Sequence, residues 1–204
     1  MLEANNLECV RGDRILFSAL NFSLQAGEVL QVNGPNGSGK TTLLRTLCGL
    51  MTPAHGEIRW GDQAIRALGE EYLKETAYLG HLNGIKDDLS ALENLHINST
   101  LSGASVSRED AAAALHTLGI EGCEDLPTKL LSQGQKRRVA MARLLTSTAR
   151  LWVLDEPYTA LDSAAVQTVQ HMISEHVAAG GLVVLTTHQE VAIDRVPVRH
   201  IHLA

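Results

Sequence analysis

The stretch that decides the fold is GPNGSGKT, residues 34–41. It follows the apolar run EVLQVN and leads into TLLRTLCGL, so we expect a strand, a glycine-rich turn and a helix in that order. The stretch matches the pattern G-x-x-x-x-G-K-[ST] in the context that supports it, a loop whose backbone N–H groups hold the phosphates of a nucleotide. The alternative interpretation is a glycine turn that is purely structural.

Each residue type in this loop has a chemical purpose. The glycines let the backbone fold tightly, and Lys40 places a positive charge at the β- and γ-phosphates. The hydroxyl of Thr41 suits Mg²⁺, and Thr42 can bond the α-phosphate at a helix N-terminus, where the helix dipole favours an anion. The predicted nucleotide-binding residues are Gly34, Pro35, Asn36, Gly37, Ser38, Gly39, Lys40, Thr41 and Thr42.

A second chemical motif lies in RLWVLDEP, residues 150–157. Its apolar residues predict a buried strand that ends at Asp155, where a carboxylate can hold Mg²⁺ through water. Glu156 is placed to orient and deprotonate an attacking water molecule. An apolar run followed by two acids is often only a strand that meets a loop, and it gains significance from the loop at residues 34–41.

The segments around the glycine-rich loop predict a β-layer and a helical block. RILFSALNFSL, residues 14–24, predicts a strand or hairpin arm, and the proline and glycines of residues 51–62 predict a hairpin around a short strand. From about residue 89 to 146 the pattern is helical. It includes a helix that Ser107 caps and Gly119 ends.

Strands and helices alternate again in the last third of the chain. The strand that ends at Asp155 precedes a helix with one apolar face, and the apolar run LVVLTTH, residues 182–188, predicts a further buried strand. The residues of that helix face are Val166, Val169, Ile173 and Val177. We therefore expect an α/β fold in which helices cover a parallel sheet, beside an antiparallel β-layer.

Composition excludes several classes of function. With 204 residues, 45% of them apolar, the chain can form one compact domain with its own core. The formal charge of −6 and an aromatic content of 3% argue against a nucleic-acid surface. Lys136, Arg137 and Arg138 form a short basic run, which we interpret as a solvated helix face rather than a nucleic-acid site.

The sequence also indicates where the chain works. Its three cysteines are scattered without a CxxC pair, so neither a disulfide framework nor a zinc site is expected. The first residues, MLEANNLECV, lack the features of a signal peptide, and no apolar run is long enough for a membrane span. We therefore expect a cytosolic protein that contacts a membrane only through a partner.

Five motifs occur in the order shown by ABC-type ATPases: residues 34–41, LSQGQ at 131–135, VLDEP at 153–157, TALD at 159–162, and His188 after VVLTT. The chain resembles this family over essentially its whole length. The resemblance implies one ABC nucleotide-binding domain over residues 1–204. Such a domain has a RecA-like parallel-sheet core, an antiparallel β-subdomain and a helical subdomain inserted at about residues 89–146. It binds ATP and Mg²⁺, with Thr41 and Asp155 at the metal, and hydrolyses ATP to ADP and phosphate.

In this family two such domains stack head to tail, and the LSQGQ loop of one closes over the ATP of the other. The resemblance therefore implies a homodimer in which Ser132, Gly134 and Gln135 contact the γ-phosphate held by a neighbouring chain. A serine N-cap, a glycine and a fresh helix start suit an anion. Gln133 departs from the family, which usually has glycine there.

Single residues carry further implications of the resemblance. His188 matches the switch histidine that contacts the γ-phosphate, and with Glu156 and His81 it completes the predicted catalytic set. Asp162 matches the loop that communicates across the dimer, and it can also cap the following helix.

Two positions depart from the family pattern. Arg11 stands near the place of an aromatic that stacks on adenine, and its planar guanidinium can stack in the same way. His81 stands in the place of a glutamine that touches Mg²⁺ and the attacking water and relays to the membrane partner. Imidazole can bond water or metal, with a dependence on pH. Alternatively, His81 is only a loop residue and the coupling takes another route.

Within the ABC proteins, the compact length, ECVRGDR with Arg11 and YLGH with His81 resemble the haem-exporter ATPases of cytochrome c biogenesis. LSQGQKRRVAMARL and the end VRHIHLA extend the resemblance. It implies a peripheral subunit on the cytoplasmic face of a bacterial inner membrane, bound to the integral membrane subunits of a haem exporter. ATP turnover would serve haem export or release of a haem-loaded chaperone.

Some alternatives stay open. His200 and His202 alternate as residues of a terminal strand do, so we do not interpret them as haem ligands. The chain could serve an ABC transporter for another substrate. It could also be a regulatory module in which ATP-driven dimerisation, rather than hydrolysis, is the signal.

Overall fold

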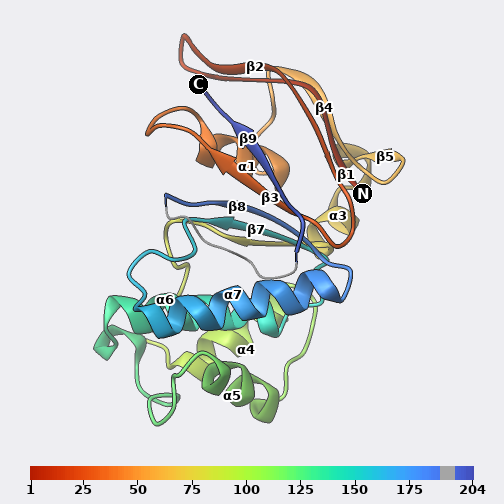
Figure 1. Cartoon of the computed structure of the whole chain (residues 1–204). Helices are drawn as coiled ribbons and strands as arrows, with labels where there is room; N and C mark the ends of the chain where they lie inside the picture. The colour runs from red at the N-terminus through yellow and green to blue at the C-terminus, as the bar shows by residue number, and fades with distance from the viewer. Residues whose placement is uncertain (189–195) are drawn as a thin grey trace.

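The computed structural model describes residues 1–188 and 196–204. Two sheets form the framework of this part of the chain (Figure 1). The larger sheet is parallel, and its strands in spatial order are β6 (Thr76–Leu79), β7 (Leu151–Asp155), β8 (Leu182–Thr186), β3 (Val29–Asn33) and β9 (Val198–His202). Every residue of β7 and β8 is buried, as expected for strands that are covered on both faces. The predicted parallel sheet is confirmed.

The smaller sheet is antiparallel and has the order β2-β1-β4-β5. Its strands are β1 (Leu2–Arg11), β2 (Arg14–Leu24), β4 (His55–Trp60) and β5 (Gln63–Ala64). The predicted strand at residues 14–24 and the short strand within residues 51–62 are confirmed, and the second strand of the hairpin, β5, lies just beyond the predicted range. Strand β1 was not predicted, because its alternation breaks where the pairing register shifts after Asn5 and Asn6 has a φ of 50°.

Helix α1 (Lys40–Leu47) fills the space between the two sheets (Figure 1). Leu43, Leu44 and Leu47 are fully buried there, in one core with residues of both sheets. Burial of a leucine side chain contributes about 1.5–3 kcal/mol, so these three residues hold the layers together. The other face of the parallel sheet is covered by α6 (Gln133–Leu145) and α7 (Ser163–Ala178), with α4 (Ala91–Leu101) and α5 (Arg108–Thr117) beyond them.

The predicted helix signals are in place. Ser107 caps α5 by accepting a hydrogen bond from the backbone N–H three residues later, and Gly119, just past its end, has a φ of 67°. Asp162 caps α7 in the same way as Ser107 caps α5. The predicted apolar face of α7 packs into the core, with Val166 partly buried and Val169, Ile173 and Val177 buried.

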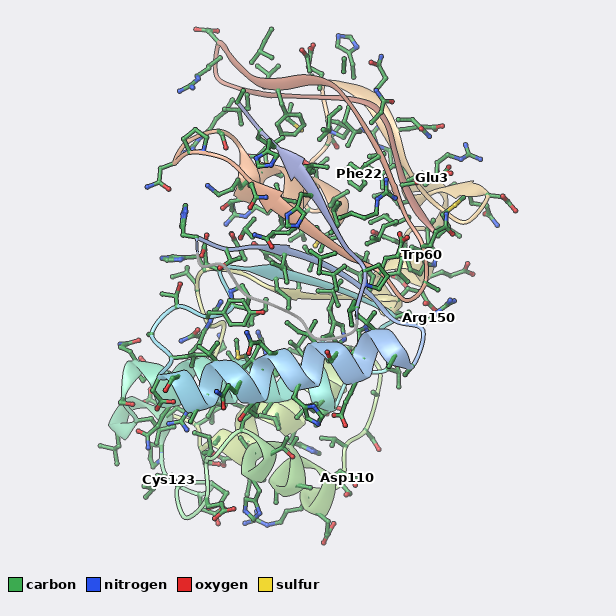
Figure 2. All side chains as sticks on the ribbon, viewed as in Figure 1. Glu3, Phe22, Trp60, Asp110, Cys123 and Arg150 are labelled. Atoms are coloured by element: carbon green, nitrogen blue, oxygen red, sulfur yellow. The ribbon has the colours of Figure 1, made fainter. Side chains whose placement is uncertain are left out.

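Aromatic contacts join the two sheets at the amino ends of the parallel strands. The Cζ atom of Arg150, which precedes β7, lies 5.8 Å from the ring centroid of Trp60 in β4 (Figure 2). Trp60 meets the ring of Tyr72 edge on, at a centroid distance of 5.9 Å. The short elements nearby and in the linkers are α2 (Ile65–Leu68), α3 (Glu70–Lys74) and the 3-10 turn η1 (Thr128–Leu130).

Cys9, Cys48 and Cys123 are free, and the first two are buried. Among the described residues, no helix has both the length and the apolar character that a bilayer crossing needs.

Candidate functional site

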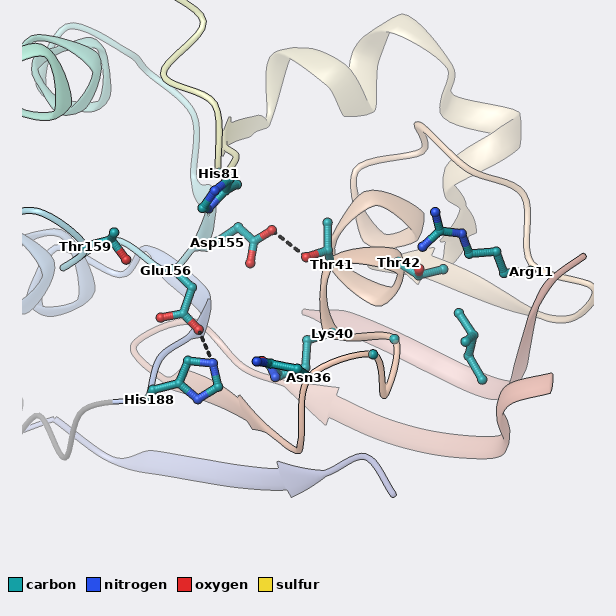
Figure 3. Close-up of a pocket in the computed structure, with 13 residues that line it drawn as sticks. Arg11, Asn36, Lys40, Thr41, Thr42, His81, Asp155, Glu156, Thr159 and His188 are labelled. Atoms are coloured by element: carbon teal, nitrogen blue, oxygen red, sulfur yellow. Dashed lines mark hydrogen bonds and ion pairs between the residues drawn. The ribbon is translucent and has the colours of Figure 1, made fainter. Parts of the chain in front are cut away.

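A pocket of about 460 Å³ opens at the carboxyl edge of the parallel sheet, where α1 begins and the chain leaves β7 (Figure 3). Ligands of open α/β sheets bind at this edge. The pocket brings together most of the predicted site residues, from distant parts of the sequence. It is lined by Arg11, Leu16, Asn36, Gly37, Gly39, Lys40, Thr41, Thr42, His81, Asp155, Glu156, Thr159 and His188.

The loop at residues 34–41 is folded around the side chain of Lys40. The Lys40 ammonium donates hydrogen bonds to two carbonyl oxygens of the loop, over 2.7 and 3.1 Å. A Cβ atom on Gly34 would lie 2.5 Å from the carbonyl oxygen of Leu203, and Gly39, the N-cap residue of α1, has a φ of 101°. Only glycine fits both positions readily, so the glycines allow the loop to close around the lysine.

Asp155, the last residue of β7, is fixed by two hydroxyl groups. The Oγ1 atom of Thr41 donates to its Oδ2 atom over 2.8 Å, and the Oγ1 atom of Thr186 donates to its Oδ1 atom over 2.8 Å. The aspartate is buried. Sequence reasoning missed Thr186. Thr186 could have been predicted from its place at the end of β8, the strand beside β7. The carboxyl ends of neighbouring parallel strands meet at one edge of the sheet.

Glu156 leaves β7 in an unusual backbone conformation. Its φ is 50°, which is uncommon for a residue other than glycine, and its N–H donates to the Oγ1 atom of Thr186 over 2.9 Å. Its Oε1 atom lies 3.4 Å from the Nε2 atom of His188, which follows β8 (Figure 3). A carboxylate and an imidazole therefore share one corner of the pocket.

The two departures from the family pattern both line the pocket. Arg11, at the end of β1, lies across the pocket from Glu156 and His188, and His81, after β6, lies on the side of Asp155 (Figure 3). Leu16 and Thr159 also line the pocket and were not predicted. No motif marks them as ligand-binding residues.

Some predicted residues do not line this pocket. Gly34, Pro35 and Ser38 shape the loop itself. Ser132, Gly134 and Gln135 lie at the start of α6, and Asp162 lies at the start of α7. One chain therefore does not bring the LSQGQ loop to its own pocket.

The start of α6 is a complete capping box. The Ser132 hydroxyl accepts a hydrogen bond from the N–H of Gln135 over 3.2 Å, and the Gln135 side chain accepts one from the N–H of Ser132 over 2.8 Å. A Cβ atom on Gly134 would lie 2.8 Å from the carbonyl oxygen of Ala160, so the loop packs closely on the segment after β7. Gln133 is exposed.

The basic run at the start of α6 is not a solvated face, and that interpretation is wrong for Arg137. Its side chain is buried beneath the ends of β6 and β7. Lys136 pairs with Asp87 over 2.7 Å, and Arg138 donates to carbonyl oxygens at the end of α5 over 3.3 and 3.4 Å. The three cations are thus engaged within the chain, Lys136 by a carboxylate and the two arginines mainly by backbone carbonyl oxygens.

Known proteins resemble this chain in sequence and in overall fold. The ABC transporter family matches residues 17–159. The chain belongs to this family. The Cytochrome c biogenesis ATP-binding export protein CcmA of Nitrosomonas europaea is 53% identical over 204 residues, which cover 100% of this chain and 96% of that protein. The full-length match places the chain among the relatives of these export proteins.

Solved structures of ABC cassettes have a fold similar to that of this chain. A dimeric bacterial ABC transporter cassette has a TM-score of 0.87 and 25% identity, with 100% of this chain and 94% of that one covered. The post-hydrolysis state of an ATP-binding cassette with ADP and phosphate has a TM-score of 0.82 and 26% identity, and it covers 93% and 88%. The chain is thus a nucleotide-binding ATPase of the ABC type, with the predicted α/β fold.

Proposed function

We propose that this chain is the ATP-hydrolysing subunit of a membrane ABC complex that serves the biogenesis of c-type cytochromes. ATP turnover in that complex powers haem export or the release of a haem-loaded chaperone. The observation that carries the proposal is the full-length identity of 53% to the export protein of Nitrosomonas europaea, together with a pocket that brings Lys40, Glu156 and His188 together.

The side chains of the pocket divide the chemistry between them. Lys40 lies in the loop where the β- and γ-phosphates of ATP bind, and its positive charge offsets theirs. Glu156 orients a water molecule and accepts its proton as the water attacks the γ-phosphorus. His188, 3.4 Å from Glu156, contacts the γ-phosphate and stabilises charge on it during transfer.

The oxygen atoms at Thr41 and Asp155 fit Mg²⁺. A hydroxyl and a carboxylate oxygen lie 2.8 Å apart at the pocket, and both are hard ligands of the kind that Mg²⁺ prefers. No three His, Cys, Asp or Glu side chains within residues 1–188 and 196–204 gather as a metal site. An ion held by one or two side chains and by substrate phosphates is typical of Mg²⁺. When bound, it neutralises phosphate charge.

A second copy of the chain completes the site. The capping box of α6 uses an acceptor lone pair of Ser132 and leaves its O–H free to donate, since a hydroxyl can do both. Together with the N-terminus of a 13-residue helix, this O–H suits the γ-phosphate of ATP in the partner's pocket. The homodimer therefore has two shared sites, and Asp162 lies near the contact between the copies.

Arg11 and His81, on different sides of the pocket, serve the adenine ring of ATP and the membrane partners, respectively. The guanidinium of Arg11 stacks on the adenine ring in place of an aromatic side chain. His81 bonds the metal or the attacking water and relays to integral membrane subunits of the exporter. Because it binds these integral subunits, the chain is a peripheral subunit on the cytoplasmic face of the bacterial inner membrane.

The function is tested in host cells that carry only the Glu156→Gln variant. We expect covalently bound haem in c-type cytochromes to disappear while b-type haem remains. Glu175→Gln, an exposed acid on α7, is the control and should leave c-type haem normal. Normal c-type haem in cells with an expressed Glu156→Gln protein would contradict the assignment to cytochrome c biogenesis. It would leave an ABC ATPase with another cargo.

A further inference from the structure

Arg137 lies where three parts of the chain meet: α6, the end of β6 and the end of β7. Its guanidinium donates hydrogen bonds to the carbonyl oxygens of Asp155 and Glu156, both over 2.9 Å, and of Gly80 over 2.8 Å. It also donates to the Oδ1 atom of Asn83 over 3.2 Å. Only 4% of the residue is exposed. One side chain therefore joins the LSQGQ helix to both strand ends at the pocket.

The chemistry of this contact indicates that Arg137 fixes the positions of backbone carbonyl groups. All four acceptors are uncharged oxygen atoms. Burial lowers the pKa of the Arg137 guanidinium, and the negative charge of Asp155 opposes that shift. A buried charge without a bonded counter-charge is a weak source of stability. What the guanidinium supplies is a rigid, planar fork that fixes several carbonyl groups at once.

Glu156 is the residue that this fork constrains. Its φ of 50° is a strained conformation, and such conformations persist only when the surroundings hold them. Thr186 holds the N–H of Glu156, while Arg137 over 2.9 Å and the N–H of Thr159 over 3.3 Å hold its carbonyl oxygen. If the bond from Arg137 is lost, only the longer bond from Thr159 holds this carbonyl, so the conformation of Glu156 that aims its carboxylate into the pocket is less constrained.

We propose that Arg137 is a positioning residue for ATP hydrolysis, which holds Glu156 in its active conformation and couples it to the start of α6. The inference rests on the proposed function of Glu156 as the base. Because α6 begins at the Ser132 capping box, a partner's ATP that binds this helix end also fixes the backbone at Glu156. The same guanidinium holds Gly80, the residue before His81.

The test compares steady-state ATP hydrolysis by the full-length chain and two variants. We expect Arg137→Met to lower kcat at least about tenfold and to leave KM for ATP within about threefold, because the hydrogen bonds of Arg137 go to residues 80, 83, 155 and 156 rather than to the phosphate-binding loop. Arg138→Met is the matched control on the same helix. It loses bonds only to the end of α5, so its kcat should stay within about twofold.

A second pair of measurements separates positioning from folding. In a Glu156→Gln background, Arg137→Met should still form ATP-driven dimers, which gel filtration detects. Arg137→Lys keeps the charge but reaches fewer acceptors, so its kcat should lie between those of wild type and Arg137→Met at an unchanged KM. If Arg137→Met does not fold, the kcat and KM of Arg137→Lys decide.

An unchanged kcat in Arg137→Met, or an equal loss of kcat, ATP binding and dimer formation, would overturn the inference. So would an Arg137→Lys variant with the kcat of wild type. Hydrolysis that survives in Glu156→Gln itself would instead refute the proposed role of Glu156. Active Arg137→Met beside inactive Glu156→Gln would refute only the positioning role.

Discussion

The hydroxyl of Thr41 donates to the carboxylate of Asp155 over 2.8 Å, so the two oxygen groups proposed for Mg²⁺ already touch each other. The bond ties the first turn of α1 to the end of β7. Thr186 holds the other carboxylate oxygen, which leaves Asp155 little freedom to rotate. The side chains proposed for Mg²⁺ are thus held in place by hydrogen bonds within the chain.

Replacement of Asp155 by asparagine tests this arrangement. The amide keeps the size of the side chain but removes its charge, so we expect the Mg²⁺ concentration for half-maximal hydrolysis to rise at least about tenfold. A magnesium titration at fixed ATP measures the change. The exposed Asp62→Asn should behave as wild type. An unchanged magnesium requirement in Asp155→Asn would refute the metal assignment.

The shared site of the dimer can be tested by complementation. Lys40→Ala should abolish phosphate binding by the loop of its own chain. Ser132→Arg should abolish the contact of its α6 N-terminus with the partner's ATP. Each variant alone is expected to be inactive. A mixture contains heterodimers with one intact site, and random pairing predicts about a quarter of wild-type hydrolysis at most. If two folded variants exchange subunits and hydrolysis stays absent, the head-to-tail geometry is wrong.

His81 can be tested against the glutamine that the family usually has. We expect His81→Gln to retain hydrolysis within about threefold, because an amide can also bond water or a metal ion. His81→Ala should lose most of the activity. Steady-state hydrolysis rates of the two variants and wild type distinguish the roles, and an alanine variant as active as wild type would mean that His81 is only a loop residue.

The sequence predicted the phosphate-binding loop because its glycines and Lys40 act locally. It missed Arg137 because the burial of that residue depends on the packing of α6 behind two strands that lie far away in the sequence. Of Lys136, Arg137 and Arg138, Arg137 is the residue whose side chain bonds the end of β7. Thr186 was missed for a similar reason: a threonine at a strand end gains its meaning from the neighbouring strand. Local chemistry was predictable, and contacts set by tertiary packing were not.

At the amino edge of the sheet, His176 stacks on the buried ring of Trp152 at a centroid distance of 3.8 Å and an angle of 8°. Its Nε2 atom lies 3.1 Å from the carbonyl oxygen of Arg150. Burial lowers the pKa of His176 below its ordinary value of 6.5. The folded chain therefore binds this proton less well than the unfolded chain, so stability falls as pH drops below about 6.5.

The measurement is the denaturant midpoint of unfolding at pH 7.5 and 5.5. We expect His176→Phe, which keeps a ring on Trp152, to show a smaller loss of stability on acidification than wild type. His171→Gln, at an exposed position of the same helix, serves as the control and should keep the wild-type loss. The same loss in His176→Phe as in wild type would exclude His176 as its source.

Gly181 makes room for the His176 ring. A Cβ atom at Gly181 would lie 2.2 Å from the Nε2 atom of His176, so Gly181→Ala must displace the imidazole from Trp152. We expect a loss of about 1–3 kcal/mol in the free energy of unfolding, typical of overpacking. In a His176→Ala background the added methyl group has space, so the double variant should be more stable than the sum of the two single effects. Urea unfolding of the four proteins measures this coupling, and strictly additive effects would show that the ring does not depend on the glycine.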